Sequence, residues 1–222
     1  LIMAYKQYKR SQRSDELLYG LGVAMDESGR DEDAVKMFAS LTRRFKKSPY
    51  RVQALLRAGR IYLEKEKYDL ASKEYTLAFR SARSPLDKGS VLMDHARVYI
   101  ARKDGNTAVT LLEKAVKQIA LAPGKNYDRF TEAYKELGGV YVSLKKYVKS
   151  ADAYNKALSF STDEREKANL GFLMGDAYQK GNILSKAKDA YQKVVASDDS
   201  VWARLARQRL STLELAQTVQ NS

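Results

Sequence analysis

The sequence contains no cysteine and only one histidine, His95, among its 222 residues. Without cysteine the chain can form no disulfide, no thiolate metal site and no cysteine nucleophile. A single imidazole does not build the multi-histidine sites that hold catalytic zinc. These absences argue against metal- and thiol-dependent chemistry, and we expect neither a metal nor a cofactor.

The short motifs of common enzyme classes are also missing. The chain has no phosphate-cradling glycine loop, no H-E-x-x-H and no G-x-S-x-G. His95 falls at a position that we expect to be apolar and packed. Acidic pairs such as Asp26–Glu27 and Asp163–Glu164 fall at predicted helix ends, where capping or solvation explains them. We therefore expect a protein without catalytic activity.

Long apolar runs are absent as well, since no stretch approaches the roughly 18–20 apolar residues that cross a bilayer. No signal peptide is visible, but the chain begins with Leu1 and not with Met, so this observation does not identify the compartment. Three prolines and twelve glycines are too few for a disordered or fibrous chain, and 44% hydrophobic residues indicate a folded one.

What the sequence does contain is a pattern that recurs five times. Small residues lie 37, 37, 42 and 37 positions apart, and each is followed by a second small residue and then by an aromatic residue or leucine. The first small residues are Gly22, Gly59, Ala96, Gly138 and Gly175; the last members are Phe38, Tyr75, Leu112, Tyr154 and Tyr191. Each unit predicts two helices joined by a short turn. The longer spacing coincides with "LAPGKNYD" (121–128), which predicts a longer loop.

This pattern resembles the tetratricopeptide repeat (TPR) family. The resemblance implies an all-α fold, a right-handed superhelical solenoid of antiparallel helix pairs with a concave inner face. The chain departs from the family in having no tryptophan at the first aromatic position and a period of 37 where 34 is usual. We expect five TPR-like repeats at about 15–49, 50–85, 86–126, 127–162 and 163–198.

The two ends of the chain predict partial elements. The segment "LIMAYKQYKR" fits the second half of a truncated preceding repeat, which we place at 1–14, and alternatively the stub of a membrane helix with basic flanking residues. Either reading predicts a piece of a longer protein. Residues 199–222 are amphipathic without a partner helix, as expected of a capping helix and tail.

The family resemblance also places residues on the concave face. The positions are Tyr19, Leu56, Arg60, Leu63, Met93, Arg97, Ile100, Lys135 and Phe172. An apolar strip bordered by two guanidinium groups suits an amphipathic helix or an extended peptide with acidic residues. Alternatively, the apolar side chains pack against neighbouring repeats and the arginines are only solvated. No asparagine follows the small residues, which argues against the chaperone carboxylate clamp of some TPR proteins.

The excess of 40 lysines and arginines over 27 acids raises a second alternative, a surface for nucleic acid or for an anionic membrane. The densest basic runs are "TRRFKKSPYR" (42–51), "FRSARS" (79–84) and "LARQR" (205–209). The first two end predicted helices, where the helix dipole favours cations. Because the tyrosines fall mostly on packing positions, the sequence favours a protein partner over nucleic acid, which stays the alternative. We expect membrane contact only through a segment preceding Leu1.

The sequence thus favours a non-catalytic scaffold that captures a protein or peptide partner in its groove, or that forms a homo-oligomer through its open repeat ends. The stretches "FKKSPYRVQALLRAGRIY" and "VVASDDSVWARLARQRLSTL" resemble repeats of bacterial envelope TPR proteins, such as the lipoprotein component of the outer-membrane barrel-assembly machinery. This resemblance favours the periplasm or cell envelope over the cytoplasm. We expect Gly59 to serve helix packing and Arg60 to contact the partner.

Overall fold

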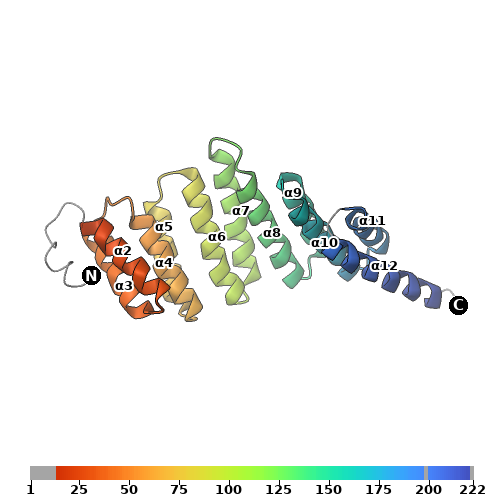
Figure 1. The fold of residues 1–222 in the computed structure, drawn as a ribbon, viewed down its shortest axis with the longest axis horizontal. Helices are drawn as coiled ribbons and strands as arrows, with labels where there is room; N and C mark the ends of the chain where they lie inside the picture. Colours follow the sequence, from red (N-terminus) through yellow and green to blue (C-terminus); the bar gives the residue numbers. More distant parts are fainter. Residues whose placement is uncertain (1–13, 198–199, 221–222) are drawn as a thin grey trace. The chain divides into compact units, whose positions relative to one another are not determined.

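The computed structural model describes residues 14–197 and 200–220, and within those ranges every regular element is an α-helix (Figure 1). The helices are α2 (Ser14–Glu27), α3 (Asp31–Arg44), α4 (Arg51–Glu64), α5 (Tyr68–Ser81), α6 (Pro85–Ala101), α7 (Gly105–Leu121), α8 (Tyr127–Ser143), α9 (Tyr147–Phe160), α10 (Glu164–Lys180), α11 (Leu184–Val195) and α12 (Ser200–Gln220). The all-α prediction is confirmed. The partial repeat expected at 1–14 lies, except for Ser14, outside the described residues.

The chain divides into two compact units, Leu1–Asp104 and Gly105–Ser222. In unit 1, each helix from α2 to α6 packs on the next, and α2, α4 and α6 also contact one another in a row. In unit 2, each helix from α7 to α12 packs on the next, and α10 also contacts α12. We call α2, α4, α6, α8 and α10 the first helices and α3, α5, α7, α9 and α11 the second helices. The surface of the first helices that is turned away from the second helices is the first-helix face.

Glycines allow the paired helices to pack closely. A Cβ added to Gly59 would lie 2.8 Å from Cε1 of Tyr75, and one on Gly138 would lie 2.5 Å from the same atom of Tyr154. The corresponding distances are 2.4 Å for Gly22 with Phe38 and 2.6 Å for Gly175 with Tyr191. Each ring is almost completely buried against the glycine of its own helix pair. The recurring glycine therefore fills a packing role, as expected for Gly59.

The turns between first and second helices share one backbone conformation. Each contains a residue with a φ of about 57–73° at the same place in the repeat: Gly29, Glu66, Lys103, Lys145 and Asn182. The following backbone N–H then donates to the carbonyl five residues earlier, as in Lys146 N–H to Tyr141 O at 2.8 Å. These are the paired bonds of a Schellman motif, which ends a helix and satisfies its last carbonyls.

Two of the first helices begin with recognisable caps. The Ser84 hydroxyl accepts from the Asp87 N–H at 3.0 Å, with Pro85 at the first helical position of α6. The Asp163 carboxylate accepts from the Glu166 N–H at 2.7 Å to begin α10. Caps of this kind stabilise a helix by about 1 kcal/mol each, so these helices have well-defined starting points.

Helix α12 covers the end of unit 2. Ala203 and Ala206 are buried against the preceding helices, and Trp202 packs on Phe172 with ring centroids 5.4 Å apart. Arg209 Nε lies 3.3 Å from Asp176 Oδ1, which adds an ion pair between α12 and α10. Apolar residues of α10 and α11 that would otherwise face water are thereby covered.

Among the described helices, not one combines the length and the apolar character that crossing a membrane demands.

Candidate partner-binding surface

The glycine gaps let tyrosine hydroxyls of the second helices reach positions expected on the first-helix face. The Tyr191 hydroxyl in α11 donates to Asp176 Oδ1 at 2.6 Å and lies 2.8 Å from Gln179 Oε1. Asp176 and Gln179 belong to α10, one and four residues after Gly175. Burial and the bond to Asp176 both raise the pKa of Tyr191, so the phenol stays protonated and available as a donor.

In unit 1, the equivalent tyrosine brings Arg60 and Arg97 to one place. Burial raises the pKa of Tyr75 and Asp94 acts in the same direction, whereas the positive charges of Arg60 and Arg97 oppose the shift. Both guanidinium groups therefore lie close enough to one hydroxyl to influence its ionisation. The charges of the two arginines of the predicted site, on α4 and α6, thus both act on the Tyr75 hydroxyl.

The two arginines have different surroundings. Arg97 Nη1 lies 2.6 Å from Asp94 Oδ1, one turn earlier on α6. Arg60 is exposed and forms no hydrogen bond or ion pair with any residue that the structure describes. The Arg60 guanidinium can therefore bind an external carboxylate without first breaking a bond to another residue of the described chain. Arg60 is thus the more available of the two.

The apolar residues predicted beside the arginines are buried to different degrees. Ile100 is 40% exposed, whereas Leu56 and Leu63 are half-buried against a cluster that includes Tyr75 and Val98. Met93 is only 2% exposed, so its side chain belongs to the interior of unit 1. This leaves Ile100 with the largest apolar surface next to the arginines.

Tyr19 is the predicted residue of α2. It is half-buried, with its ring stacked on Tyr50 at a centroid distance of 5.1 Å and tilted against Phe38 at 6.1 Å. The first contact joins it to the start of the next first helix and the second to the partner helix of its own pair. Tyr19 therefore helps hold α2 in place and presents only part of its ring to solvent.

In unit 2, both predicted residues already have internal partners. Lys135 Nζ lies 2.8 Å from Glu166 Oε1, which links α8 to α10. Phe172 is 7% exposed, between Tyr191 at 5.6 Å and Trp202 at 5.4 Å. Since Trp202 comes from α12, the surface that Phe172 would present is covered by the capping helix. The predicted residues that remain accessible are therefore concentrated in unit 1.

Sequence reasoning missed two features of these surfaces. The first is an ion pair between α2 and α4, in which Arg57 Nη1 lies 2.7 Å from Asp26 Oδ2. Burial opposes the charge on Arg57, but the bonds to Asp26 and Tyr19 leave its pKa raised. The sequence did contain a signal for this ion pair, namely two oppositely charged residues 31 positions apart. Lys135 and Glu166, which also form an ion pair, have the same spacing.

The second missed feature is a hollow of about 340 Å³ in unit 2, between α7, α8 and α9. Tyr134 and Tyr141 line it together with Lys117, Lys149 and Lys156. The Tyr141 hydroxyl donates to Glu113 Oε1 at 3.1 Å, and Lys156 Nζ lies 5.4 Å from the centre of the Tyr134 ring. The polar residues around it fall on solvent-facing positions of second helices, where no sequence pattern distinguishes a hollow from an ordinary surface.

His95 is half-buried between two tyrosine rings, Tyr75 at 5.9 Å and Tyr99 at 5.4 Å. Its Nε2 atom is buried and has no hydrogen-bond partner among the described residues. Burial lowers the pKa of His95 because the charged imidazolium is poorly solvated there. In the described part of the chain, no three histidine, aspartate or glutamate side chains gather in a way that could hold a metal ion.

Comparisons with known proteins agree with this arrangement. A family model described as a tetratricopeptide repeat-like domain matches residues 2–172, and one described as a tetratricopeptide repeat matches residues 170–199. No relative among the curated proteins matches the chain.

Solved structures with the same fold cover most of the chain. A MamA structure is 18% identical, with a TM-score of 0.63, and covers 82% of this chain and 91% of its own. BtubC (BKLC) from P. vanneervenii is 14% identical, with a TM-score of 0.69, and covers 94% of this chain and 85% of its own. The TPR-like repeats of a putative kinesin light chain from Podosopora anserina are 16% identical, with a TM-score of 0.66, and cover 84% of this chain and 96% of their own. At these identities the likeness concerns the fold alone.

The fold and the matched repeats define a class, the stacked helix pairs of TPR proteins. The chain belongs to the tetratricopeptide repeat family, as its residue pattern indicated. Proteins with this fold generally mediate protein–protein interactions and are typically non-catalytic scaffolds.

Proposed function

We propose that the chain is a non-catalytic scaffold that binds a segment of a partner protein on the first-helix face of unit 1. The observation that supports this most directly is the state of Arg60, which is exposed, without an internal partner, and near Arg97. Both arginines project from helices that are packed on two sides, so little order has to be gained when a partner binds.

The chemistry of this surface favours a partner segment with both acidic and apolar residues. Arg60 and Arg97 suit carboxylates, and the 40% exposed Ile100 lies one turn beyond Arg97 on the same helix. A helix or extended segment that places a carboxylate next to an aliphatic side chain would use both kinds of contact. Met93 and Phe172 are too deeply buried to contribute, so the proposed contact set is narrower than the one drawn from the sequence.

A peptide-binding experiment tests this proposal. Acidic–apolar peptides would be selected by display on the full 222-residue chain, and their affinities measured by calorimetry. We expect the double variant Arg60→Glu/Arg97→Glu to bind at least about tenfold more weakly, since reversing two charges replaces attraction with repulsion. The melting temperature should change little, because Arg60 has no internal partner among the described residues and because the Arg97–Asp94 ion pair joins partly exposed residues three apart on one helix, where such a pair contributes little.

The matched control reverses two exposed lysines on second helices, Lys73 of α5 and Lys114 of α7. This variant, Lys73→Glu/Lys114→Glu, has the same net charge as the arginine variant but an intact first-helix face. It should retain the wild-type affinity. Equal weakening in both variants would show that net charge governs binding, and unchanged binding in the arginine variant would refute the proposed site.

We include in the proposal that the scaffold works within a bacterial multiprotein assembly of the cell envelope. Its support is the likeness of two stretches of the sequence to envelope TPR proteins. Protease accessibility of the chain in spheroplasts, compared with a cytoplasmic marker protein, is the direct measurement. Digestion of the chain while the marker survives is the expected result, and protection of both would place the chain in the cytoplasm.

A further inference from the structure

The connections that lead from second to first helices carry a strongly basic surface in unit 1. Residues 42–51 and 80–88 contain eight lysines and arginines and a single acid, Asp87. We call this surface the basic edge; its cations are Arg43, Arg44, Lys46, Lys47, Arg51, Arg80, Arg83 and Lys88.

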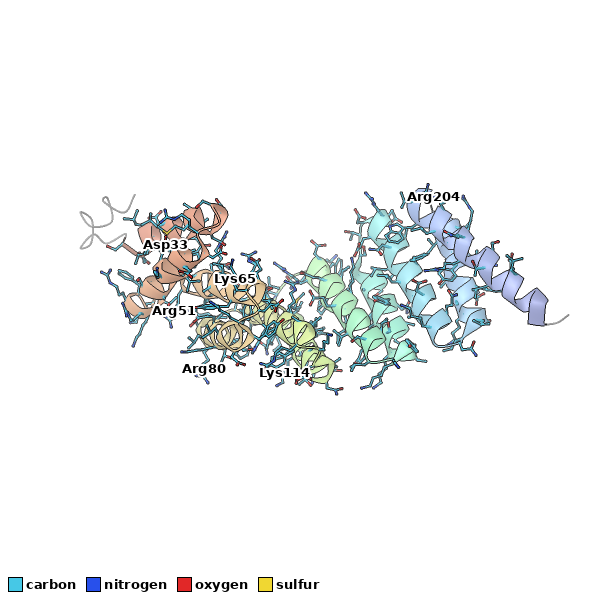
Figure 2. All side chains as sticks on the ribbon, turned by 90° about the horizontal axis from the view of Figure 1, so that it is seen from below. Asp33, Arg51, Lys65, Arg80, Lys114 and Arg204 are labelled. Carbon is cyan, nitrogen blue, oxygen red and sulfur yellow. The ribbon has the colours of Figure 1, made fainter. Side chains whose placement is uncertain are left out.

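Hydrogen bonds show that the two connections lie side by side. Arg51, the first residue of α4, donates through Nε to the Ser81 hydroxyl at 3.0 Å. The same guanidinium donates to the Thr42 carbonyl at the end of α3. Arg51 therefore ties the end of α3, the start of α4 and the end of α5 into one surface. In Figure 2, Arg51 and Arg80 lie on the opposite side of unit 1 from Asp33 and Lys65.

The opposite edge of unit 1 has the reverse charge. The turns between first and second helices, at 26–33, 64–69 and 102–104, contain nine acids and five bases. There three of the five bases form ion pairs: Arg30 with Asp33, Lys65 with Asp31 at 2.7 Å, and Arg102 with Asp69 at 2.8 Å. The charge of unit 1 is therefore separated into an acidic edge and a basic edge.

Helix dipoles account for only part of the basic edge. Arg43, Arg44 and Arg80 occupy last turns of α3 and α5, where a cation is stabilised. Lys46, Lys47 and Arg83 lie beyond those turns, so the dipole does not explain them. Five cations of the edge are exposed and form no ion pair with a described residue: Arg43, Lys46, Lys47, Arg80 and Arg83. Their charge is available to an external anion.

The aromatic residues of the edge indicate which kind of anion fits. Phe45 and Phe79 are half-buried, and each has a cation of the edge over its ring: Arg44 at 5.2 Å and Lys88 at 5.9 Å. Rings covered in this way are not open platforms for stacking nucleobases. A cluster of exposed lysines and arginines without open rings is instead suited to the anionic headgroups of a membrane, which attract such cations by about 1 kcal/mol each. The hollow found in unit 1, of about 650 Å³, lies at the acidic edge.

We propose that the basic edge binds the surface of a bilayer containing anionic phospholipids. The exposed cations of two adjacent connections would contact the headgroup phosphates together, and each would add to the attraction. The sequence raised an anionic membrane as an alternative partner of the basic surface, although we expected membrane contact only through a segment before Leu1; the proposal replaces that segment with the basic edge. The edge is separate from Arg60 and Arg97, so lipid binding does not depend on the partner-binding proposal.

Vesicle flotation with the full 222-residue chain tests the inference. The probe is a vesicle of phosphatidylcholine with about 30% phosphatidylglycerol, compared with a vesicle of pure phosphatidylcholine. We expect binding to the anionic vesicle only, with a loss of at least about tenfold when salt rises from roughly 50 to 500 mM, because the Debye length shortens from about 14 to about 4 Å. Equal binding to both vesicles, or to neither, would refute the proposal.

Two charge-matched variants locate the surface. The edge variant is Lys46→Glu/Lys47→Glu/Arg80→Glu/Arg83→Glu; the control is Lys67→Glu/Lys114→Glu/Lys146→Glu/Lys180→Glu, which reverses four exposed lysines elsewhere. Each replacement lowers the formal charge by two, so both variants change it from +13 to +5. The edge variant should lose at least about tenfold in vesicle partitioning and the control less than about threefold.

A similar loss in the two variants would attribute binding to net charge and overturn the assignment to the edge. Binding of the wild type to a 30-base oligonucleotide but not to anionic vesicles would overturn the choice of lipid in favour of nucleic acid. Should the edge variant not fold, as judged by circular dichroism, the same four positions changed to glutamine test the proposal with a smaller charge change.

Discussion

At the scale of single residues, the contact between a glycine and an aromatic ring determines how closely two helices of a pair approach. The pairs Gly22–Phe38, Gly59–Tyr75, Gly138–Tyr154 and Gly175–Tyr191 are all 16 residues apart. Where the ring is a tyrosine it does more than fill space: the Tyr191 hydroxyl reaches Asp176 and Gln179, across the glycine gap. For Tyr75, Tyr154 and Tyr191, three of the 15 tyrosines, the structural reason is a position where the ring is buried and the hydroxyl can reach polar groups.

The pair of neighbouring glycines in α8 provides a test of this contact. Replacing Gly138 with alanine would place a methyl group within 2.5–2.7 Å of three atoms of the buried Tyr154 ring. We expect Gly138→Ala to lower the free energy of unfolding by about 1–3 kcal/mol, as overpacking a core does. Urea denaturation followed by circular dichroism measures the change.

Gly139 is the matched control, since it is the next residue of the same helix and is exposed. A Cβ there would lie 3.8 Å from the Tyr154 hydroxyl, which is an ordinary contact. Gly139→Ala should therefore raise the free energy of unfolding by up to about 1 kcal/mol, through better helix propensity. Similar effects of the two changes would contradict the steric explanation.

His95 predicts a pH dependence that can be assigned to one residue. Burial holds its folded-state pKa below the usual value of 6.5, so the unfolded chain takes up a proton first as pH falls. Titration of His95 therefore has no effect on the free energy of unfolding above about pH 6.5. The free energy of unfolding decreases as pH falls from there toward the folded-state pKa, and below that pKa His95 causes no further change. We expect the melting temperature to fall between pH 7.5 and 5.5.

Because His95 is the only histidine, its replacement isolates the effect. Carboxylates titrate mainly below this window, so the melting temperature of His95→Leu should be nearly independent of pH between 7.5 and 5.5. The leucine also removes the buried Nε2 atom that has no hydrogen-bond partner among the described residues. Persistence of the full pH dependence in His95→Leu would assign it to other groups.

At the scale of secondary-structure elements, the backbone conformation of the turns is the same in every repeat, whereas the residue types in the turns differ. The left-handed residue is glycine in the first turn but glutamate, lysine, lysine and asparagine in the others. In "RKDGN" and "QKGNI", the glycines Gly105 and Gly181 are not the left-handed residues; Lys103 and Asn182 are. The sequence therefore predicts that a turn exists, but glycine position alone does not predict which residue adopts the left-handed conformation.

The left-handed lysines predict a stabilising change. A lysine with φ of 57°, as at Lys145, pays a steric cost that glycine avoids. Glycine would relieve this steric cost, but it also loses more conformational freedom on folding, which offsets part of the gain. We therefore expect Lys145→Gly to raise the free energy of unfolding by a net amount of about 0.5–1 kcal/mol. The measurement is again urea denaturation.

Lys146 serves as the control for this turn. It follows directly, is exposed and has a φ of −92°, so it needs no left-handed conformation. Lys146→Gly removes the same kind of side chain without relieving any strain, and we expect no gain in stability. If both glycine variants were equally stable, the backbone conformation of Lys145 would not be the cause.

At the scale of the whole molecule, the repeat frame could be predicted from the sequence. It depends on a small residue that leaves room for a large side chain of the next helix, and these two kinds of residue recur at a fixed spacing. Which residues of that frame are open to a partner was less predictable. Met93 and Phe172 occupy positions of the same kind as Leu56, yet they are 2% and 7% exposed. For Phe172 the reason is a helix that lies beyond the repeats, since Trp202 of α12 packs on it.

The division into two compact units was also not apparent in the sequence. The boundary, between Asp104 and Gly105, falls inside the stretch 86–126 that the frame assigns to a single repeat. That repeat has Ala96 and Leu112 where the other four have a glycine and an aromatic residue. Composition revealed the total charge of the chain, but its separation into two edges of unit 1 required the alternation of turns and connections that the structure provides.

The distribution of contacts within and between helix pairs has a consequence for how such a chain can be lengthened or recombined. Each glycine and the ring that packs on it belong to the same helix pair. When a whole helix pair is duplicated or exchanged, this contact is therefore kept. The ion pairs Asp26–Arg57, Asp31–Lys65 and Lys135–Glu166 join one pair to the next. A pair inserted from another chain would keep its glycine–ring contact, but its two borders would have to match both the apolar clusters that span neighbouring pairs and the charges of these ion pairs.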